Sequence, residues 1–204
     1  MPSWTRALLL ALAVGTVAGC QKSGGDEMML SPTNSPFKNT DVTGLDYAKG
    51  FTLTDHQGNP RSLGDFKGKA VIVFFGFTQC PDVCPTTLAE MAEARKLLGD
   101  QADKLQVLFI TVDPERDTPQ LLANYVPAFD PSFIGLTGDQ AAIEKVAKEF
   151  RVFYQKVPGK EKGSYSMDHT AGSYVFDPQG RIRLFVRHGQ GPEVIAQDIK
   201  RLLS

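Results

Sequence analysis

The apolar residues of this chain are grouped into short runs and helical stripes that alternate from about residue 51 onward. Two runs rich in β-branched and aromatic side chains, at 70–75 and 107–112, predict strands that are covered on both faces. Apolar positions at helical spacing predict four helices, which follow Pro85, run over 119–125 and 140–150, and begin at Pro192.

Turn residues between the apolar runs predict two hairpins. Residues 51–54 and a turn at 57–60 are typical of an edge hairpin, and residues 173–176 and 181–186 flank the turn Asp-Pro-Gln-Gly. Strands that alternate with helices, followed by a hairpin and a closing helix, predict a three-layer α/β domain.

The composition is consistent with a single α/β domain but does not indicate a binding partner. The chain has 204 residues, of which 42% are hydrophobic and 22% charged, and this suits one globular domain with a substantial core. Because the formal net charge is −1, nothing indicates a nucleic-acid partner or a strongly charged substrate, and we expect neither. The sequence also has no glycine-rich phosphate loop.

The N-terminus has the pattern of an export signal. Arg6 precedes an apolar run at 7–14, and the sequence Val-Ala-Gly-Cys that ends at Cys20 resembles a bacterial lipobox. An uncleaved membrane anchor is the alternative, but the apolar run is shorter than the roughly 20 residues that span a bilayer. We therefore expect a signal peptide over 1–19 and a lipid on Cys20.

This assignment places the protein in the bacterial cell envelope, with its domain in the periplasm or another extracytoplasmic space. Residues 20–43 are rich in Ser, Gly, Pro and Asn and predict a flexible tether, and residues 44–204 form the domain. Met28 and Met29 in the tether could relay a soft metal, although adjacent methionines in a linker usually have no such role.

Cys80 and Cys84 are the only thiols expected in the mature domain. They directly follow the first buried strand, at the carboxyl edge where open α/β sheets place their sites. Pro85 marks the first turn of a helix there, and free amides at a helix N-terminus favour thiolate over thiol. Such a pair can close a disulfide, attack a substrate disulfide or bind a thiophilic metal.

A metal would need a third ligand, and imidazole is the commonest side-chain donor. His169 lies in a polar stretch before the strand at 173, so it can reach the same edge of the sheet. His188 and His56 are expected at the surface. The residues alone leave the ligand role of His169 open.

Three segments together resemble the Sco/SenC family of copper chaperones. They are Phe-Gly-Phe-Thr-Gln-Cys-Pro-Asp-Val-Cys-Pro at 75–85, Val-Asp-Pro-Glu-Arg-Asp-Thr-Pro at 112–119 and Asp-His-Thr at 168–170. The resemblance extends over 44–204. It implies a thioredoxin-like fold, with a mixed central sheet and helices on both faces.

The resemblance also implies a function. One copper ion, Cu(I) or Cu(II), would be bound by Cys80, Cys84 and His169 and used to mature the binuclear copper centre in subunit II of cytochrome c oxidase. Another periplasmic copper donor or a thiol reductant would be a further partner. Asp113 would approach the site from the second motif, or else act only in its turn and helix cap. The family pattern implies a binding protein first, with a secondary thiol–disulfide oxidoreductase activity compatible with it.

Three alternatives use the same cysteines differently. A thiol–disulfide reductase would act on the cysteines of the same target without a metal, and a structural disulfide would be inert. A short loop between Cys80 and Cys84 argues against the structural disulfide, because the entropic gain grows with loop length. A peroxidase of the peroxiredoxin type is disfavoured because Thr78 lies two residues before Cys80, where that class has threonine three before, and no proline occurs between Arg61 and Gln79.

Overall fold

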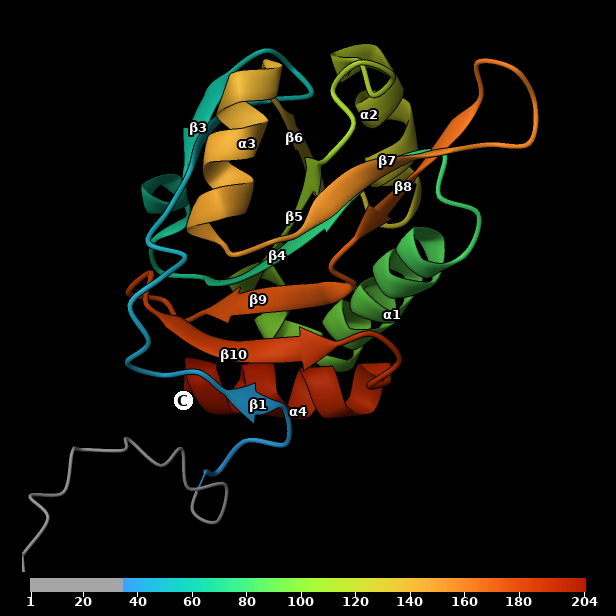
Figure 1. Cartoon of the computed structure of the whole chain (residues 1–204). Coiled ribbons are helices and arrows are strands. Elements are labelled where there is room, and N and C mark those ends of the chain that lie inside the picture. The colour runs from blue at the N-terminus through green and yellow to red at the C-terminus, as the bar shows by residue number, and fades with distance from the viewer. Residues whose placement is uncertain (1–34) are drawn as a thin grey trace, which may run out of the picture. The chain divides into compact units, whose positions relative to one another are not determined.

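The computed structural model describes residues 35–204, which contain one eight-stranded sheet and a separate two-stranded ribbon (Figure 1). The strand order in the large sheet is β1-β10-β9-β4-β5-β6-β2-β3. Its strands are β1 (Thr40–Asp41), β2 (Thr52–Asp55), β3 (Pro60–Ser62), β4 (Ala70–Gly76), β5 (Leu105–Thr111), β6 (Ile134–Thr137), β9 (Gly172–Phe176) and β10 (Ile182–Arg187). The ribbon consists of β7 (Tyr154–Pro158) and β8 (Tyr165–His169).

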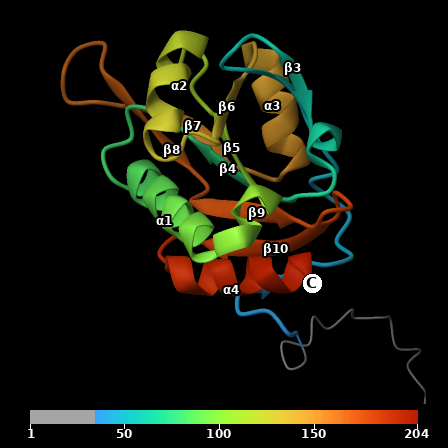
Figure 2. The same cartoon turned by 180° about the vertical axis from the view of Figure 1, so that it is seen from behind.

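Helices cover both faces of a mixed sheet, as the sequence predicts. Strand β4 pairs in parallel with β5 and antiparallel with β9, and β5 pairs in parallel with β6. The helices are α1 (Val83–Leu97), α2 (Pro119–Tyr125), α3 (Gln140–Glu149) and α4 (Pro192–Leu203). Helices α1, α2 and α4 lie on one face and α3 on the other, which opposite views show (Figures 1 and 2). Short 3₁₀ segments are η1 (Leu63–Phe66), η2 (Gly99–Lys104) and η3 (Val126–Ala128).

The centre of the core lies on β4 and β5, whose residues are all buried. On one side of β4, Phe75 contacts Phe150 edge-on at a centroid distance of 5.2 Å, and Phe150 contacts Tyr174 of β9 at 5.3 Å. Continuous apolar runs form these two strands because both of their faces are covered.

Helix starts follow the sequence signals closely. The Thr118 hydroxyl accepts a hydrogen bond from the Leu121 amide at the start of α2, and the Asp139 carboxylate accepts one from the Ala142 amide at the start of α3. Such side-chain caps satisfy amides that have no partner within the helix. Helix α1 begins at Val83, without a side-chain hydrogen bond from its N-cap.

Residues just before the domain boundary expected at 44 are bound to the domain. The amides of Lys38 and Asn39 donate to Asp198 of α4 at 2.9 and 2.8 Å, and β1 pairs with β10. The expected signal peptide, Cys20 and the methionine pair at 28–29 lie outside the described residues. Within residues 35–204, no helix is long and apolar enough to cross a bilayer.

Two parts of the structure were not expected from the sequence. Strand β6 is short and contains a glycine, and the β7–β8 ribbon is mostly polar and half-exposed. His169, expected in a loop, is instead the last residue of β8. Strand β8 approaches the start of α1 (Figure 1), and the His169 ring at its end contacts Cys84 in the first turn of that helix.

Candidate metal centre

Cys80 and Cys84 lie in the turn from β4 into α1. Cys84 is the second residue of the helix, and its backbone amide donates to the sulfur of Cys80 at 3.4 Å. An amide donor of this kind stabilises negative charge on sulfur. Both thiols are free; Cys80 is half-buried, whereas Cys84 is completely enclosed. The turn therefore presents one accessible and one inaccessible sulfur at the carboxyl edge of the sheet.

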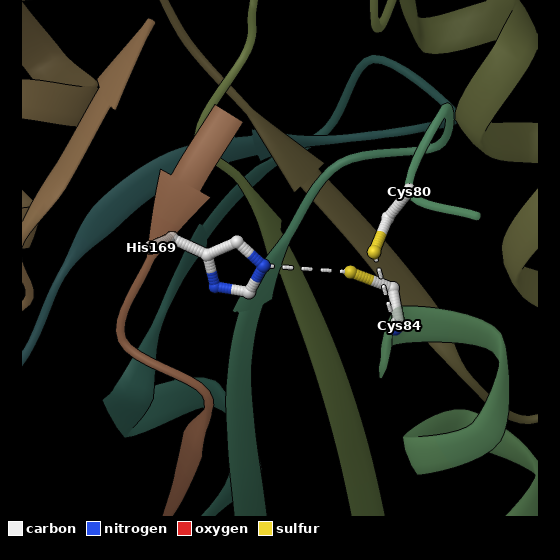
Figure 3. Close-up of side chains that lie close together, drawn as sticks. All are labelled: Cys80, Cys84 and His169. Carbon is white, nitrogen blue, oxygen red and sulfur yellow. Dashed lines mark hydrogen bonds between the residues drawn. The ribbon is translucent and has the colours of Figure 1, made fainter. Parts of the chain in front are cut away.

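His169 approaches this pair from the ribbon. Its Nε2 atom lies 3.6 Å from Cys84 Sγ, although 85 residues separate the two in the sequence (Figure 3). The two sulfurs and an imidazole nitrogen all lie within 4.8 Å of one another. No other group of three or more Cys, His, Asp or Glu side chains within residues 35–204 converges in this way. The structure thus brings together the three residues that the resemblance implies as ligands.

The surroundings of His169 fix how its ring faces the sulfurs. Its Nδ1 lies 3.1 Å from the carbonyl oxygen of Thr170, which can only accept a hydrogen bond. With the proton on Nδ1, the lone pair of Nε2 points to the cysteines, as a metal ligand requires. The edges of Phe74 and Phe77 pack around the ring at centroid distances of 6.1 and 6.0 Å. Burial lowers the pKa of His169 and so favours the neutral ring, whose Nε2 lone pair is free to bind a metal.

Cys84 responds to burial in the opposite direction. Burial raises the pKa of its thiol far above the usual range, and a hydrogen bond from the Phe77 backbone offsets this only in part. The thiolate expected at a helix N-terminus is thus not favoured at Cys84 in the metal-free protein. A bound cation would compensate the buried charge, because thiols lose their protons when they bind metal.

One side of the group is open. A pocket of about 290 Å³ is lined by Cys80 and His169 together with Pro81 and Met167, among other residues. Two thiols and one imidazole form a donor set that suits copper, since sulfur favours Cu(I) and imidazole also accepts Cu(II). An ion at this position would be reachable from the pocket.

The other two histidines are placed differently. His188 Nδ1 lies 3.0 Å from the hydroxyl of Thr87 on α1, and His56 Nδ1 accepts a hydrogen bond from the Gly135 amide at 3.0 Å. Neither belongs to the converging group.

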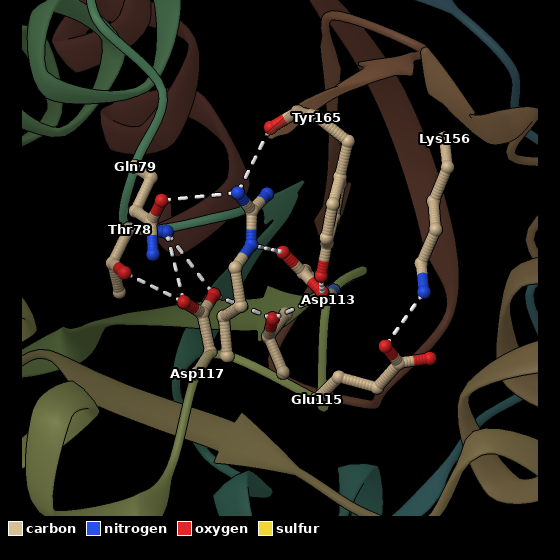
Figure 4. A network of polar contacts seen from close by, with 9 residues as sticks. Thr78, Gln79, Asp113, Glu115, Asp117, Lys156 and Tyr165 are labelled. Atoms are coloured by element: carbon tan, nitrogen blue, oxygen red, sulfur yellow. Dashed lines mark hydrogen bonds and ion pairs between the residues drawn. The ribbon is translucent and has the colours of Figure 1, made fainter. Parts of the chain in front are cut away.

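Asp113 is nearby but does not belong to the group either. Its buried carboxylate pairs with Arg116 Nε and accepts a hydrogen bond from the Tyr165 hydroxyl at 2.9 Å (Figure 4). Asp113 therefore contacts residues that surround the metal centre and is not one of the three side chains that converge there.

A second carboxylate in the same loop was missed by the sequence reasoning. Asp117 is buried and accepts hydrogen bonds from the Thr78 amide at 3.0 Å, the Thr78 hydroxyl at 2.6 Å and the Thr111 hydroxyl at 2.6 Å (Figure 4). Burial raises its pKa, and these hydrogen bonds oppose that rise. The cluster of charged residues in the segment 112–119 was the sequence signal that could have indicated a polar network here. Nothing in the sequence indicated that Tyr165 contacts this segment.

Comparison with known proteins identifies the family. A family model described as SCO1/SenC matches residues 40–204, which is most of the chain. The chain belongs to the SCO1/SenC family. Mouse protein SCO2 homolog, mitochondrial, is similar to this SCO1/SenC protein, with 37% identity over 156 residues that make up 76% of this chain. Those residues make up 61% of the mouse protein, so the chain spans about three fifths of that relative's length.

Solved structures agree with this assignment. Bradyrhizobium japonicum ScoI with copper bound is 47% identical, has a TM-score of 0.70, and matches over 76% of this chain and 98% of its own. A SCO1/SenC family lipoprotein from Bacillus anthracis is 28% identical, with a TM-score of 0.67, over 78% of this chain and 97% of its own. The expected family and the thioredoxin-like α/β fold class of this SCO1/SenC protein are thereby confirmed.

Proposed function

We propose that this SCO1/SenC protein binds one copper ion through Cys80, Cys84 and His169 and serves as a copper metallochaperone. Its target would be the binuclear copper centre in subunit II of cytochrome c oxidase. The convergence of two sulfurs and an imidazole nitrogen within 4.8 Å carries the proposal. The relative ScoI, whose structure has copper bound, supports it at 47% identity.

The chemistry of release follows from the open side of the centre. Three protein ligands leave the pocket side of the ion free, so that thiolates of a partner can reach it there. Binding requires both cysteines in the reduced form. Joining their sulfurs in a disulfide releases two protons and two electrons to an oxidant and removes both donors, so the redox state controls loading.

Attachment to a membrane is the second part of the proposal. We infer a signal peptide at 1–19, a lipid on Cys20 and a tether after it. The tether expected over 20–43 would end earlier than residue 43, because Lys38 and Asn39 bind α4 and β1 pairs with β10, so these residues belong with the copper-binding domain expected over 44–204. The sequence pattern before Cys20 supports this, as does the relative from Bacillus anthracis, which is a lipoprotein. The domain would then act in the extracytoplasmic space of the cell envelope.

Thiol–disulfide reduction of the same target is the second candidate. It is supported by the unequal exposure of the two sulfurs, because Cys80 is accessible and Cys84 is enclosed beside it. In this reaction Cys80 would attack a target disulfide to form a mixed disulfide. Cys84 would then release the reduced target by closing the bond to Cys80.

Copper titration of the reduced protein tests the first function. One copper per chain is expected for the wild type. The Cys80→Ser/Cys84→Ser variant should not bind copper, and His169→Ala should bind it about tenfold more weakly. His188→Ala is the matched control. The His188 side chain contacts Thr87 and lies outside the converging group, so this variant should bind copper normally. Retention of one copper per chain in the double cysteine variant would refute the proposed site.

A further inference from the structure

The three side chains of the metal centre come from two separate segments of the chain. The cysteines follow β4, and His169 ends the β7–β8 ribbon. In the described part of the chain this ribbon pairs with no strand of the large sheet. The large sheet therefore holds the chain only from β9 onward, three residues after His169, and contacts outside the sheet ladder help to set the separation between His169 and the sulfurs.

Arg116 makes contacts with both segments. Its Nη1 atom donates to the side-chain oxygen of Gln79 at 3.0 Å and to the carbonyl oxygen of Tyr165 at 2.9 Å (Figure 4). Gln79 immediately precedes Cys80, and Tyr165 is the first residue of β8, the strand that ends at His169. One nitrogen thus joins the cysteine turn to the histidine strand.

Stacking reinforces the link between Arg116 and the ribbon. The guanidinium carbon lies 3.7 Å from the ring centroid of Tyr165. It also lies 5.8 Å from the ring centroid of Phe77, which belongs to the segment that leads to the cysteines. A planar guanidinium suits this position, because it can stack on a ring and donate in fixed directions at once. A lysine side chain offers neither the plane nor the fork.

Asp113 fixes the orientation of both Arg116 and Tyr165. Its carboxylate, 1% exposed, pairs with Arg116 Nε and accepts from the hydroxyl of Tyr165 at 2.9 Å. The acid therefore restrains both the guanidinium and the ring on which it stacks. Removing Arg116 would leave a buried carboxylate without its cation and the ribbon without its connection to Gln79.

We propose that Arg116 is a positioning residue of the metal centre, which sets the distance of His169 from Cys84 by joining the ribbon to the cysteine turn. This rests on the proposed copper site and adds no ligand to it. A purely structural ion pair with Asp113 is the competing interpretation. The two differ in whether the effect of Arg116 on copper passes through His169.

A double-mutant cycle between Arg116 and His169 separates the two interpretations. Cu(I) affinity is measured by competition with a chromophoric chelator for wild type, Arg116→Met, His169→Ala and the double variant. We expect Arg116→Met to weaken Cu(I) binding about tenfold in the wild-type background and to have little effect in the His169→Ala background. The Cu(II)–thiolate absorption spectrum of Arg116→Met should also move towards that of His169→Ala.

Arg61→Met is the matched control. Arg61 also pairs with an almost buried aspartate, Asp55, at 2.8 Å, but it lies on β3 at the far edge of the sheet. Its loss should leave copper affinity and the Cu(II) spectrum unchanged. If Arg116→Met fails to fold, Arg116→Lys replaces it in the same cycle, because it keeps the charge beside Asp113 and loses the fork.

Each result decides the question. Wild-type affinity in Arg116→Met, or an equal loss in both backgrounds, would overturn the positioning role while leaving the copper site intact. Unchanged copper affinity in His169→Ala would overturn the proposed site and this inference together. A loss confined to the background that retains His169 supports the role.

Discussion

Gly76 lies directly against Cys84: a Cβ atom placed on Gly76 would be 2.9 Å from the cysteine sulfur and 2.8 Å from the Phe109 ring. Glycine is thus needed at the end of β4 so that the first turn of α1 can pack onto the strand. The enclosed sulfur owes its position to this missing side chain.

Replacing Gly76 by alanine should therefore disturb both stability and the metal centre. Because Phe109 is fully buried and cannot move aside, the added methyl displaces the sulfur of Cys84. We expect the free energy of unfolding to fall by about 1–3 kcal/mol, as for other overpacked cores, with weaker Cu(I) binding. Urea denaturation and chelator competition measure the two effects. Gly64→Ala is the control, since its Cβ would meet only the Ser62 oxygen at an ordinary 3.5 Å; equal behaviour of both variants would contradict the argument.

Asp117 should contribute more stability than an exposed helix cap. In Asp117→Ala the amide and hydroxyl of Thr78 and the hydroxyl of Thr111 lose their acceptor inside the protein. Unsatisfied buried donors cost about 1–3 kcal/mol each, so we expect a loss of at least about 3 kcal/mol in urea denaturation. Asp139→Ala removes a single exposed cap at α3 and should cost about 1 kcal/mol. Similar losses in the two variants would show that the Asp117 network is not a major source of stability.

Asp177 should give the protein part of its resistance to acid. Burial alone would raise the pKa of this carboxyl, but hydrogen bonds from the Arg181 backbone and from the Arg181 and Arg183 side chains outweigh it and hold the pKa below the usual 3.8. The folded state therefore keeps the charge to lower pH than the unfolded state does. The stabilisation is complete above the unfolded pKa and is lost as the pH falls through the lowered folded value.

Asp177→Asn tests this dependence. The variant should lose about 2 kcal/mol of unfolding free energy at about pH 7, and its stability should fall less steeply than that of wild type towards about pH 3. Urea denaturation across this range gives both quantities. A constant difference between wild type and variant at every pH would mean that the ionisation of Asp177 contributes nothing to the acid limb.

The two cysteines should differ strongly in reactivity. Cys80 is half-buried and receives a hydrogen bond from the Cys84 amide, whereas Cys84 is enclosed and burial raises the pKa of its thiol. Iodoacetamide should modify Cys80 in Cys84→Ser at least about tenfold faster than Cys84 in Cys80→Ser. Mass spectrometry of timed samples measures both rates. Equal rates would show that the enclosed sulfur opens readily to solvent.

The sequence was most informative where local signals and burial agreed. The apolar runs of β4 and β5 and the caps Thr118 and Asp139 could be recognised because each depends on neighbouring residues. The β7–β8 ribbon could not, because β7 shows no alternation of apolar and polar residues and the alternation in β8 extends over only five residues. Likewise, the contact of Arg116 with Tyr165 joins positions 49 residues apart, and no local pattern encodes such a pairing.

The isolation of the β7–β8 ribbon has a consequence for the dynamics of the centre. Within residues 35–204 its two strands pair in a ladder only with each other and reach the rest of the domain through side-chain contacts such as that of Arg116, so the ribbon can open locally while the large sheet stays closed. Backbone amides of β8 should then exchange with deuterium faster than those of β9, and an ion that bridges the ribbon to α1 should slow them. Whether the site holds an ion would in this way change the mobility of the whole hairpin, and a partner that contacts the hairpin would meet a more rigid surface when the ion is bound.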